Sequence, residues 1–236
     1  MRTPHGRHEL KILISYAEYL LLKNRVAAVL ETDKNAGNEG YFIRSVYFDD
    51  FKESVYYEKL NDINDRRKYR IRAYNNNSNY IILECKEKHK QYIHKNSAVI
   101  DIETCKALLE GNYDIILNRP ESVLNEFYID CKRLGLKSAV VVDYHRDAFT
   151  YPASNVRITF DKELHAGGLN GFDMFFDDKK SELTLPVYMN NSVILEIKYD
   201  DYLPAFIRHL IPSFTGVPIS ISKYCLCRNV NKSIRY

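Results

Sequence analysis

Apolar and polar residues alternate along much of the chain with a period of two, the pattern that is typical of half-buried β-strands. The alternating segments are rich in Ile, Val, Tyr and Phe. They predict eight strands, with residues 92–100 as a further candidate. The eight lie at residues 7–14, 41–48, 66–74, 80–88, 138–149, 155–161, 192–200 and 219–227.

Helical spacing and capping residues predict helices between these strands. Ser15 and Glu18 form a capping box ahead of apolar residues spaced three and four apart. Asp101 is expected to cap a second helix, and Gly135 to end a third. Helices after the first are predicted at 54–60, 102–110, 121–134 and 201–210, and loops at 75–79 and 165–191.

The organisation of the sequence indicates one domain. No internal repeat, low-complexity tract or long Pro/Gly-rich linker divides it, so residues 1–236 are expected to form a single unit of folding. Many strands with helices between them favour an α+β protein dominated by an antiparallel sheet or barrel.

The composition narrows the class of protein. Lys and Arg number 34 and Asp and Glu 31, and a net charge of +3 does not by itself indicate a nucleic-acid binder. The five cysteines are an odd number without paired C-x-x-C spacing, which argues against a disulfide framework and a zinc site. No apolar run approaches the roughly 20 residues of a membrane span. We therefore expect a soluble, cytoplasmic protein with no membrane span in this chain; a membrane-protein partner stays open.

Charged residues gather on one face of several predicted strands. The segment RRKYRIRAY (66–74) places Lys68, Arg70 and Arg72 on one face and Tyr69 and Ile71 on the other. Any single face of this kind is usually just solvated. However, six strands carry Arg or Lys at alternate positions with a few Glu between them, whereas ordinary wet faces favour Thr, Ser, Gln and mixed charges. Amphipathic helices need an apolar sheet face to pack on, so we expect helices outside a barrel and cations inside it.

A barrel lined in this way needs a ligand or water. About ten cations without partners would each cost several kcal/mol if buried, so the interior must hold water or a polyanion. Arginine binds phosphate oxygens through two parallel hydrogen bonds, and lysine adds point charges. The few glutamates suggest a divalent metal, because Mg²⁺ and Mn²⁺ take carboxylate oxygens together with substrate phosphates.

Eight short motifs, taken in order, resemble one family. The motifs are RHELK (7–11), SVYFDD (45–50), RIR (70–72), LECKEK (83–88), DYHRDAF (143–149), VRITFD (156–161), LEIKYDDYLP (195–204) and SKY (222–224). In this order they look like the VTC domain, the polyphosphate polymerase branch of the triphosphate tunnel metalloenzyme (CYTH-like) superfamily. The resemblance runs from about Arg7 to Asn229.

The resemblance implies a fold, an activity and a set of residues. The fold is an eight-stranded antiparallel β-barrel, the triphosphate tunnel, with amphipathic helices packed outside. The activity is that of an ATP-dependent polyphosphate polymerase, a phosphotransferase that adds the ATP γ-phosphate to inorganic polyphosphate with Mn²⁺ or Mg²⁺. The implied catalytic residues are Arg70, Arg72, Lys198 and Glu196, with Glu196 as the metal ligand. The implied substrate-binding residues are Lys11, Lys86, Lys88, Tyr144, Arg146, Arg157, Ser222 and Lys223.

Two departures from the family pattern bear on the activity. Arg7 stands where hydrolytic members carry a carboxylate, which favours polymer handling over hydrolysis. His145 stands where members often have Glu, and strand alternation turns it away from the interior. Two alternatives stay open: a tripolyphosphatase or nucleoside triphosphatase of the same fold, and a non-catalytic polyphosphate-binding module. The expected partners are ATP and inorganic polyphosphate or triphosphate, and nucleic acid is not expected because no aromatic stacking platform interleaves the cations.

Overall fold

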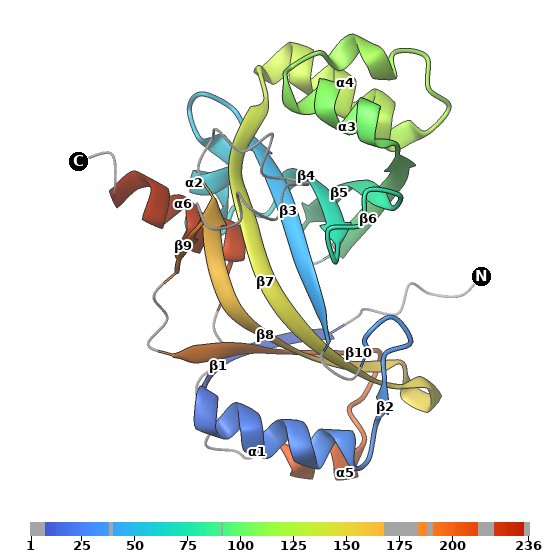
Figure 1. The fold of residues 1–236 in the computed structure, drawn as a ribbon, viewed down its shortest axis with the longest axis vertical. Helices are drawn as coiled ribbons and strands as arrows, with labels where there is room; N and C mark the ends of the chain where they lie inside the picture. Colours follow the sequence, from blue (N-terminus) through green and yellow to red (C-terminus); the bar gives the residue numbers. More distant parts are fainter. Residues whose placement is uncertain are drawn as a thin grey trace. The chain divides into compact units, whose positions relative to one another are not determined.

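The computed structural model describes residues 8–37, 40–90, 92–167, 184–187, 191–211 and 220–233. They form an α+β protein, a mostly antiparallel sheet with several helices (Figure 1). The strands are β1 (His8–Ser15), β2 (Glu31–Thr32), β3 (Tyr41–Asp49), β4 (Arg66–Tyr74), β5 (Ile81–His89), β6 (Tyr92–Ile100), β7 (Lys137–Tyr151), β8 (Val156–Gly167), β9 (Leu185–Pro186) and β10 (Ser192–Tyr199). The helices are α1 (Tyr16–Ala27), α2 (Ser54–Leu60), α3 (Ile102–Leu109), α4 (Ser122–Leu134), α5 (Ala205–Leu210) and α6 (Lys223–Ser233), with 3₁₀ turns at Tyr113–Ile116 and Pro152–Ser154.

The predicted eight-stranded barrel is wrong in strand number and in closure. The sheet has ten strands in the order β1-β10-β8-β7-β3-β4-β5-β6, with β2 paired to β7 and β9 paired to β8. The two extra strands are the two-residue segments β2 and β9, which are too short to show alternation in a sequence. Among the residues that the structure describes, the end strands β1 and β6 do not pair with one another, so the sheet is not closed.

The strand predicted at 219–227 is also wrong, because the chain is helical from Lys223 onward. Ser222 caps this helix: the Cys225 amide donates to Ser222 Oγ at 3.4 Å, and the Leu226 amide donates to the Ser222 carbonyl at 3.0 Å. Tyr224 and Cys227 are three residues apart, so a strand would place them on opposite faces, whereas one face of a helix can bury both.

The other predicted strands and helices are confirmed, except that the helix predicted at 201–210 begins only at Ala205, after Pro204. The capping residues explain where α1 and α3 begin and where α4 ends. Ser15 and Glu18 form the capping box of α1, with the Glu18 amide 3.2 Å from Ser15 Oγ. Asp101 caps α3 by accepting from the Thr104 amide at 2.7 Å. Gly135 ends α4 in the left-handed conformation, with φ of 68°.

Two compact units make up the chain. Unit 1 contains Met1–Tyr41, Tyr144–Leu164 and Tyr188–Ile221. Unit 2 contains Phe42–Asp143, His165–Val187 and Ser222–Tyr236.

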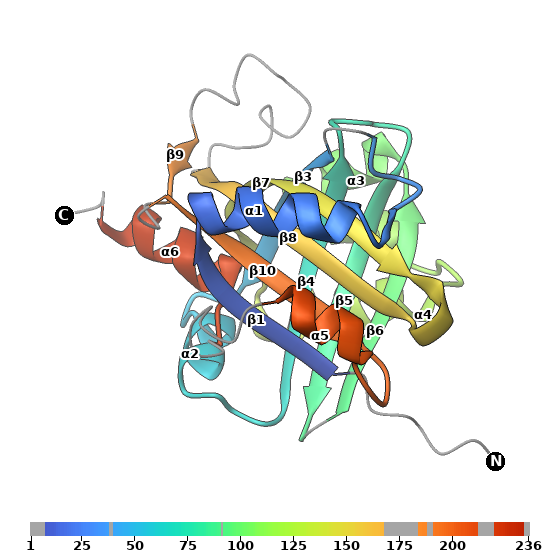
Figure 2. The same ribbon diagram turned by 90° about the horizontal axis from the view of Figure 1, so that it is seen from below.

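Unit 1 has its own apolar core beneath α1 and α5, the two helices that Figure 2 shows over strands β1, β10 and β8. Leu22 and Val26 of α1 pack with residues on one face of each strand. The strand residues of this core are Ile12 and Ile14 of β1, Phe149 of β7, Val156, Ile158 and Phe160 of β8, and Val193, Leu195 and Ile197 of β10. The period-two alternation of these strands leaves their polar residues on the opposite face.

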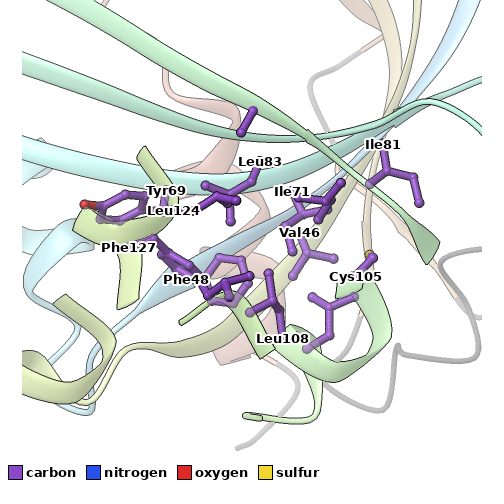
Figure 3. Packing of buried hydrophobic residues seen from close by; sticks show 14 of the residues in the cluster. Val46, Phe48, Tyr69, Ile71, Ile81, Leu83, Cys105, Leu108, Leu124 and Phe127 are labelled. Atoms are coloured by element: carbon purple, nitrogen blue, oxygen red, sulfur yellow. The ribbon is translucent and has the colours of Figure 1, made fainter. Parts of the chain in front are cut away.

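Unit 2 has a second core, between strands β3, β4 and β5 and helices α3 and α4 (Figure 3). Tyr69 and Ile71 of β4 and Leu83 of β5 point toward Leu124 and Phe127 of α4, as Figure 3 shows. The expectation that helices cover the apolar strand faces is therefore confirmed within each unit. Among the residues that the structure describes, no helix is long and apolar enough to cross a membrane.

Candidate functional site

Arg70, Arg72, Lys86 and Lys88, the strand cations predicted for the site in unit 2, lie on the face of β4 and β5 that points away from the core of that unit. In the antiparallel register Arg70 lies opposite Glu84 of β5 and Tyr47 of β3, while Arg72 lies opposite Ser45. Directly opposite residues share a sheet face, so these side chains are neighbours. We call this surface the unit 2 face; it consists of Ser45, Tyr47, Lys68, Arg70, Arg72, Glu84, Lys86, Lys88 and Lys95.

Each arginine of the R-x-R motif is held by a hydroxyl of β3. Arg70 Nη1 donates to the Tyr47 hydroxyl at 3.0 Å, and Arg72 Nε donates to Ser45 Oγ at 3.2 Å. These bonds orient the two guanidinium groups, which stay positively charged at any pH at which the protein is folded.

Glu84 is the carboxylate that the two arginines share. It is 2% exposed, with its Oε2 2.5 Å from Arg70 Nε and 3.6 Å from Arg72 Nη1, and Lys95 pairs with its other oxygen. Burial opposes ionisation of this group, but Arg70, Arg72 and Lys95 outweigh it and lower the pKa of Glu84 to about 2. Glu84 is therefore a permanent counter-charge for three cations.

Three lysines form a row next to these arginines. Lys68 of β4 lies opposite Lys86 of β5, which lies opposite Lys95 of β6. Like charges directly opposite one another destabilise a sheet, so this row is favourable only where anions share the surface. Farther along the same face, Lys88 lies opposite Arg66, and Asp62 pairs with both of them.

Ser222 and Lys223 lie at the start of α6 and not on a strand. The next residue, Tyr224, donates its hydroxyl to Asp49, and its ring lies 5.3 Å from the ring of Tyr47. Lys68 Nζ lies over both rings, at 5.0 Å from Tyr47 and 5.9 Å from Tyr224. The start of α6 therefore packs beside the lysine row.

Unit 1 carries the remaining predicted residues on the face opposite its own core. Lys11 of β1 lies opposite Glu196 of β10, which lies opposite Thr159 of β8. The neighbouring row is Glu9, Lys198 and Arg157. We call this surface the unit 1 face; it consists of Glu9, Lys11, Tyr144, Arg146, Arg157, Thr159, Asp161, Glu196 and Lys198.

Arg146 is fixed by a two-point ion pair. Its Nε lies 2.5 Å from Asp161 Oδ1 and its Nη2 lies 2.7 Å from Asp161 Oδ2, and the guanidinium carbon lies 5.3 Å from the centre of the Tyr144 ring. Burial acts against the charged form, but Asp161 and Glu196 raise the pKa of Arg146 well above its ordinary value. This guanidinium is permanently charged and has one orientation.

Glu196 and Lys198 form the second ion pair of the unit 1 face. Lys198 Nζ lies 2.5 Å from Glu196 Oε1 and 4.0 Å from Glu9 Oε1, while Glu196 Oε2 lies 3.9 Å from Arg146 Nη2. Burial lowers the pKa of Lys198 even though both carboxylates favour the ammonium. An added anion at this point would favour the charged lysine.

Thr159 has a buried hydroxyl with no hydrogen-bond partner, next to Glu196. The residue is 3% exposed, and its Oγ1 is without a donor or acceptor. Buried polar groups are nearly always paired, so this hydroxyl is suited to contact a ligand oxygen, a metal or water. Thr159 is not among the residues predicted from the sequence, because a lone Thr on a strand carries no signal of a site.

The carboxylates of the unit 1 face fit a divalent cation that takes most of its ligands from phosphate. Within the described part of the chain, no cluster of three or more His, Cys, Asp or Glu can hold a metal alone. Glu196 and the Thr159 hydroxyl offer hard oxygen donors side by side. Mg²⁺ is usually held by one or two carboxylates plus substrate phosphates, so the donor set fits.

The structure thus distributes the sequence-predicted residues over two surfaces. The unit 2 face holds Arg70, Arg72, Lys86 and Lys88, and the unit 1 face holds Lys11, Tyr144, Arg146, Arg157, Glu196 and Lys198. Ser222 and Lys223 lie at the start of α6, in the same unit as the unit 2 face. The Arg157 guanidinium contacts residues outside the unit 1 face: it pairs with Asp33 at 3.0 Å and donates to the Tyr41 hydroxyl at 3.0 Å. Arg7 lies outside the described residues.

Sequence reasoning missed the residues that hold these cations in place. Tyr47 and Ser45 lie in a strand of mostly apolar residues, where a Tyr normally indicates core. Lys95 lies in β6, the strand with the weakest alternation, and its role appears only once β6 is paired with β5. The partners of Arg70 and Arg146 depend on strand order, which alternation alone does not predict.

Comparison with solved structures finds distant likenesses. A Bacillus halodurans protein described as a "putative adenylate cyclase" is 14% identical with a TM-score of 0.46, and the match covers 87% of each chain. The PH1819 protein of Pyrococcus horikoshii OT3 is 12% identical with a TM-score of 0.47, over 95% of this chain and 99% of that one. A comparison with curated proteins finds no match.

The family comparison covers nearly the whole chain. The model of the VTC domain matches residues 6–231 of 236, which includes every strand and helix of both faces except the last two residues of α6. This match confirms the resemblance seen in the eight sequence motifs. The chain belongs to the VTC domain family.

Proposed function

We propose that this chain is a polyphosphate polymerase that binds ATP and inorganic polyphosphate on its cationic faces and transfers the ATP γ-phosphate to the polyphosphate chain. The observation that carries the proposal is the unit 2 face, where the row Lys68, Lys86 and Lys95 adjoins Arg70 and Arg72. A chain of phosphates carries negative charge along its length, and guanidinium and ammonium groups are the side chains that bind phosphate oxygens best. Family membership supports the same substrate class.

Phosphoryl transfer requires positioning and charge neutralisation more than covalent chemistry. Arg70, Arg72 and Arg146 are held by hydroxyl or carboxylate partners, so each guanidinium presents a fixed fork to phosphate oxygens. Burial lowers the pKa of Lys198, and a phosphate beside it would favour the charged ammonium. These residues stabilise negative charge where it develops.

The acceptor needs little activation. The end of a phosphate chain is already an oxyanion at neutral pH, so the reaction can proceed without a strong general base. No His lies among the residues that make up either face, in keeping with that requirement. The chain's contribution is to hold donor and acceptor phosphates.

A divalent metal, Mn²⁺ or Mg²⁺, is proposed as the cofactor. Glu196 would hold it, with the Thr159 hydroxyl as the adjacent oxygen. When bound, such a cation neutralises charge on the phosphate oxygens during transfer. Lys198 now occupies one oxygen of Glu196, and a phosphate oxygen would draw that ammonium away from the carboxylate.

Hydrolysis of triphosphate is the second candidate. It would use the same faces, with water as the acceptor of the phosphate. We favour polymerisation because Arg7 stands where hydrolytic relatives carry a carboxylate. A non-catalytic module would need only the cations, which bind polyphosphate, and not the metal site. The three functions differ in the product formed from ATP.

The test is incubation of the chain with ATP and Mn²⁺, followed by a gel that separates polyphosphate from orthophosphate. We expect polyphosphate with the wild type and none with Arg70→Ala. Lys106→Ala, which removes an exposed lysine of α3, is the matched control and should leave the product unchanged. Orthophosphate alone would identify a hydrolase, and binding of tripolyphosphate without any product would identify the non-catalytic module.

A further inference from the structure

Tyr47 occupies an unusual position for a tyrosine of a strand. It is 4% exposed and lies directly opposite Arg70, whose Nη1 donates to its hydroxyl at 3.0 Å. A hydroxyl that accepts a hydrogen bond from a guanidinium holds its proton less tightly, because the bond and the positive charge stabilise the ionised oxygen. The phosphate-binding proposal gives this acidity no role.

The groups packed around Tyr47 are mostly cations. From β4, Lys68 Nζ lies 5.0 Å and the Arg70 guanidinium 5.8 Å from the ring centre, with Arg72 two residues farther along. From α6 the neutral ring of Tyr224 packs at 5.3 Å. From β5 the nearby anion is Glu84, which Arg70, Arg72 and Lys95 already hold.

This surrounding charge makes Tyr47 acidic. Burial by itself would raise the pKa of the phenol, but Arg70, Lys68 and Arg72 outweigh that effect and lower the pKa to about 7. At pH 8 a phenolate would thus lie against Arg70 as a second internal anion beside Glu84. The two groups differ in where they ionise: the pKa of Glu84 is about 2, so Glu84 stays ionised near neutral pH, whereas Tyr47 can gain or lose its proton there.

We propose that Tyr47 is the proton-exchanging residue of the unit 2 face: its hydroxyl is ionised while Arg70 and Arg72 hold no phosphate, and it takes up a proton when a phosphate chain binds there. The proton comes from solvent and joins the phenolate oxygen, and no other bond changes. A bound phosphate neutralises the cations that favoured the phenolate and repels it. The inference rests on the proposed phosphate binding, and it adds that Tyr47 takes up one proton when the phosphate binds.

Coupling of this kind makes affinity depend on pH. Between pH 7 and the higher pKa of the phosphate-bound state, each binding event takes up a proton. The association constant for tripolyphosphate should therefore fall as pH rises, by up to about tenfold per pH unit. Tyr47→Phe cannot take up this proton, so its affinity should vary less with pH in the same interval.

The first measurement needs no ligand. The near-ultraviolet absorbance of tyrosinate, followed against pH in the full chain, should show one tyrosine ionising near pH 7. Tyr47→Phe should lack that step, and Tyr202→Phe, at a tyrosine that is 67% exposed, should keep it. Lys68→Gln keeps Tyr47 and should move the step to higher pH, so the test does not depend on the Phe variant folding. A wild type without this ionisation overturns the proposal.

The second measurement adds tripolyphosphate at pH 8. Calorimetry in two buffers of different ionisation enthalpy should show proton uptake by the wild type, little or none by Tyr47→Phe, and loss of the tyrosinate absorbance on binding. Tight binding without proton uptake would overturn the coupling and leave the proposed function intact. An ionisation near pH 7 with no tripolyphosphate binding would instead contradict the proposed function, and the coupling with it.

Discussion

Arg70 of β4 and Glu84 of β5 lie directly opposite one another, with 2.5 Å between Arg70 Nε and Glu84 Oε2. The carboxylate is buried, while the guanidinium keeps about a fifth of its side chain exposed. A buried anion therefore fixes a cation that still faces outward. This relationship links the stability of unit 2 to its capacity to bind anions.

Removing that anion should destabilise unit 2. Glu84→Ala leaves Arg70, Arg72 and Lys95 without their shared partner, and breaking a buried ion pair costs about 3–5 kcal/mol. Because the arginines remain open to anions, tripolyphosphate should restore part of the loss. Urea unfolding with and without tripolyphosphate measures both effects. Glu110→Ala, at an exposed position after α3, is the control, and equal unfolding midpoints for the two variants would contradict the account.

The same carboxylate predicts a pH dependence. The pKa of Glu84 is lowered to about 2 from an ordinary value of 4.5, so its contribution to stability is complete above pH 4.5 and is lost as pH falls through 2. Unfolding free energy measured from pH 6 downward should fall more steeply for the wild type than for Glu84→Gln over about pH 4.5 to 2. Parallel curves for the two proteins would show that Glu84 is not held in this way.

Arg146 tests whether orientation matters beyond charge. Arg146→Lys keeps the positive charge but loses the two-point pair with Asp161, in which both distances are 2.7 Å or less. We expect tripolyphosphate affinity to fall roughly tenfold, the effect of about 1.4 kcal/mol, with the variant still folded by circular dichroism. Arg25→Lys, on the exposed side of α1, should bind like the wild type. Unchanged affinity in Arg146→Lys would show that Arg146 contributes only its positive charge and that its orientation does not matter.

Glu196 tests the proposed metal. Glu196→Gln keeps the size of the side chain and removes the charge that Lys198 and a divalent cation share. Without metal, tripolyphosphate should bind this variant at least as well as the wild type, because one negative charge is gone from the unit 1 face. Calorimetry with Mn²⁺ should then show a gain in affinity for the wild type and little gain for the variant. Equal gains would remove Glu196 from the metal site.

Comparing Gly40 with Gly111 distinguishes the cost of a steric clash with neighbouring backbone from the cost of a positive φ alone. A Cβ at Gly40 would lie 2.3 Å from the carbonyl oxygen of Arg146, whereas a Cβ at Gly111 would meet nothing within 4 Å. Both have positive φ, so both Ala variants are strained by about 1 kcal/mol. Gly40→Ala should lose several kcal/mol in urea unfolding because backbone must move as well. Similar losses for both variants would rule out the contact at Gly40.

Much of the local structure can be predicted from alternation and capping. The pattern RRKYRIRAY predicts β4 with both of its ends, because one strongly alternating strand is bounded by polar turn residues. Ser15 and Asp101 predict the starts of α1 and α3 because the caps act within three residues. The cationic character of the two faces follows from the same alternation.

What could not be predicted depends on contacts distant in sequence. At 219–227 the period of two and the helical spacing coincide, and the hydrogen bond from Tyr224 to Asp49, 175 residues away, anchors the helical form. The roles of Tyr47 and Lys95 arise only when β3 pairs with β4 and β6 with β5. A barrel would have required pairing between β1 and β6, which neither strand's own pattern specifies.

The central claim is transfer of the terminal phosphate of ATP to a phosphate chain, and isotopic labelling tests it most directly. The chain is incubated with Mn²⁺ and ATP labelled in its γ-phosphate, or in parallel in its α-phosphate, and the products are separated by length. The account predicts label in polyphosphate from the γ-position alone, and none with Arg70→Ala. Label that appears only in orthophosphate, or polyphosphate that forms equally with Arg70→Ala, would contradict it.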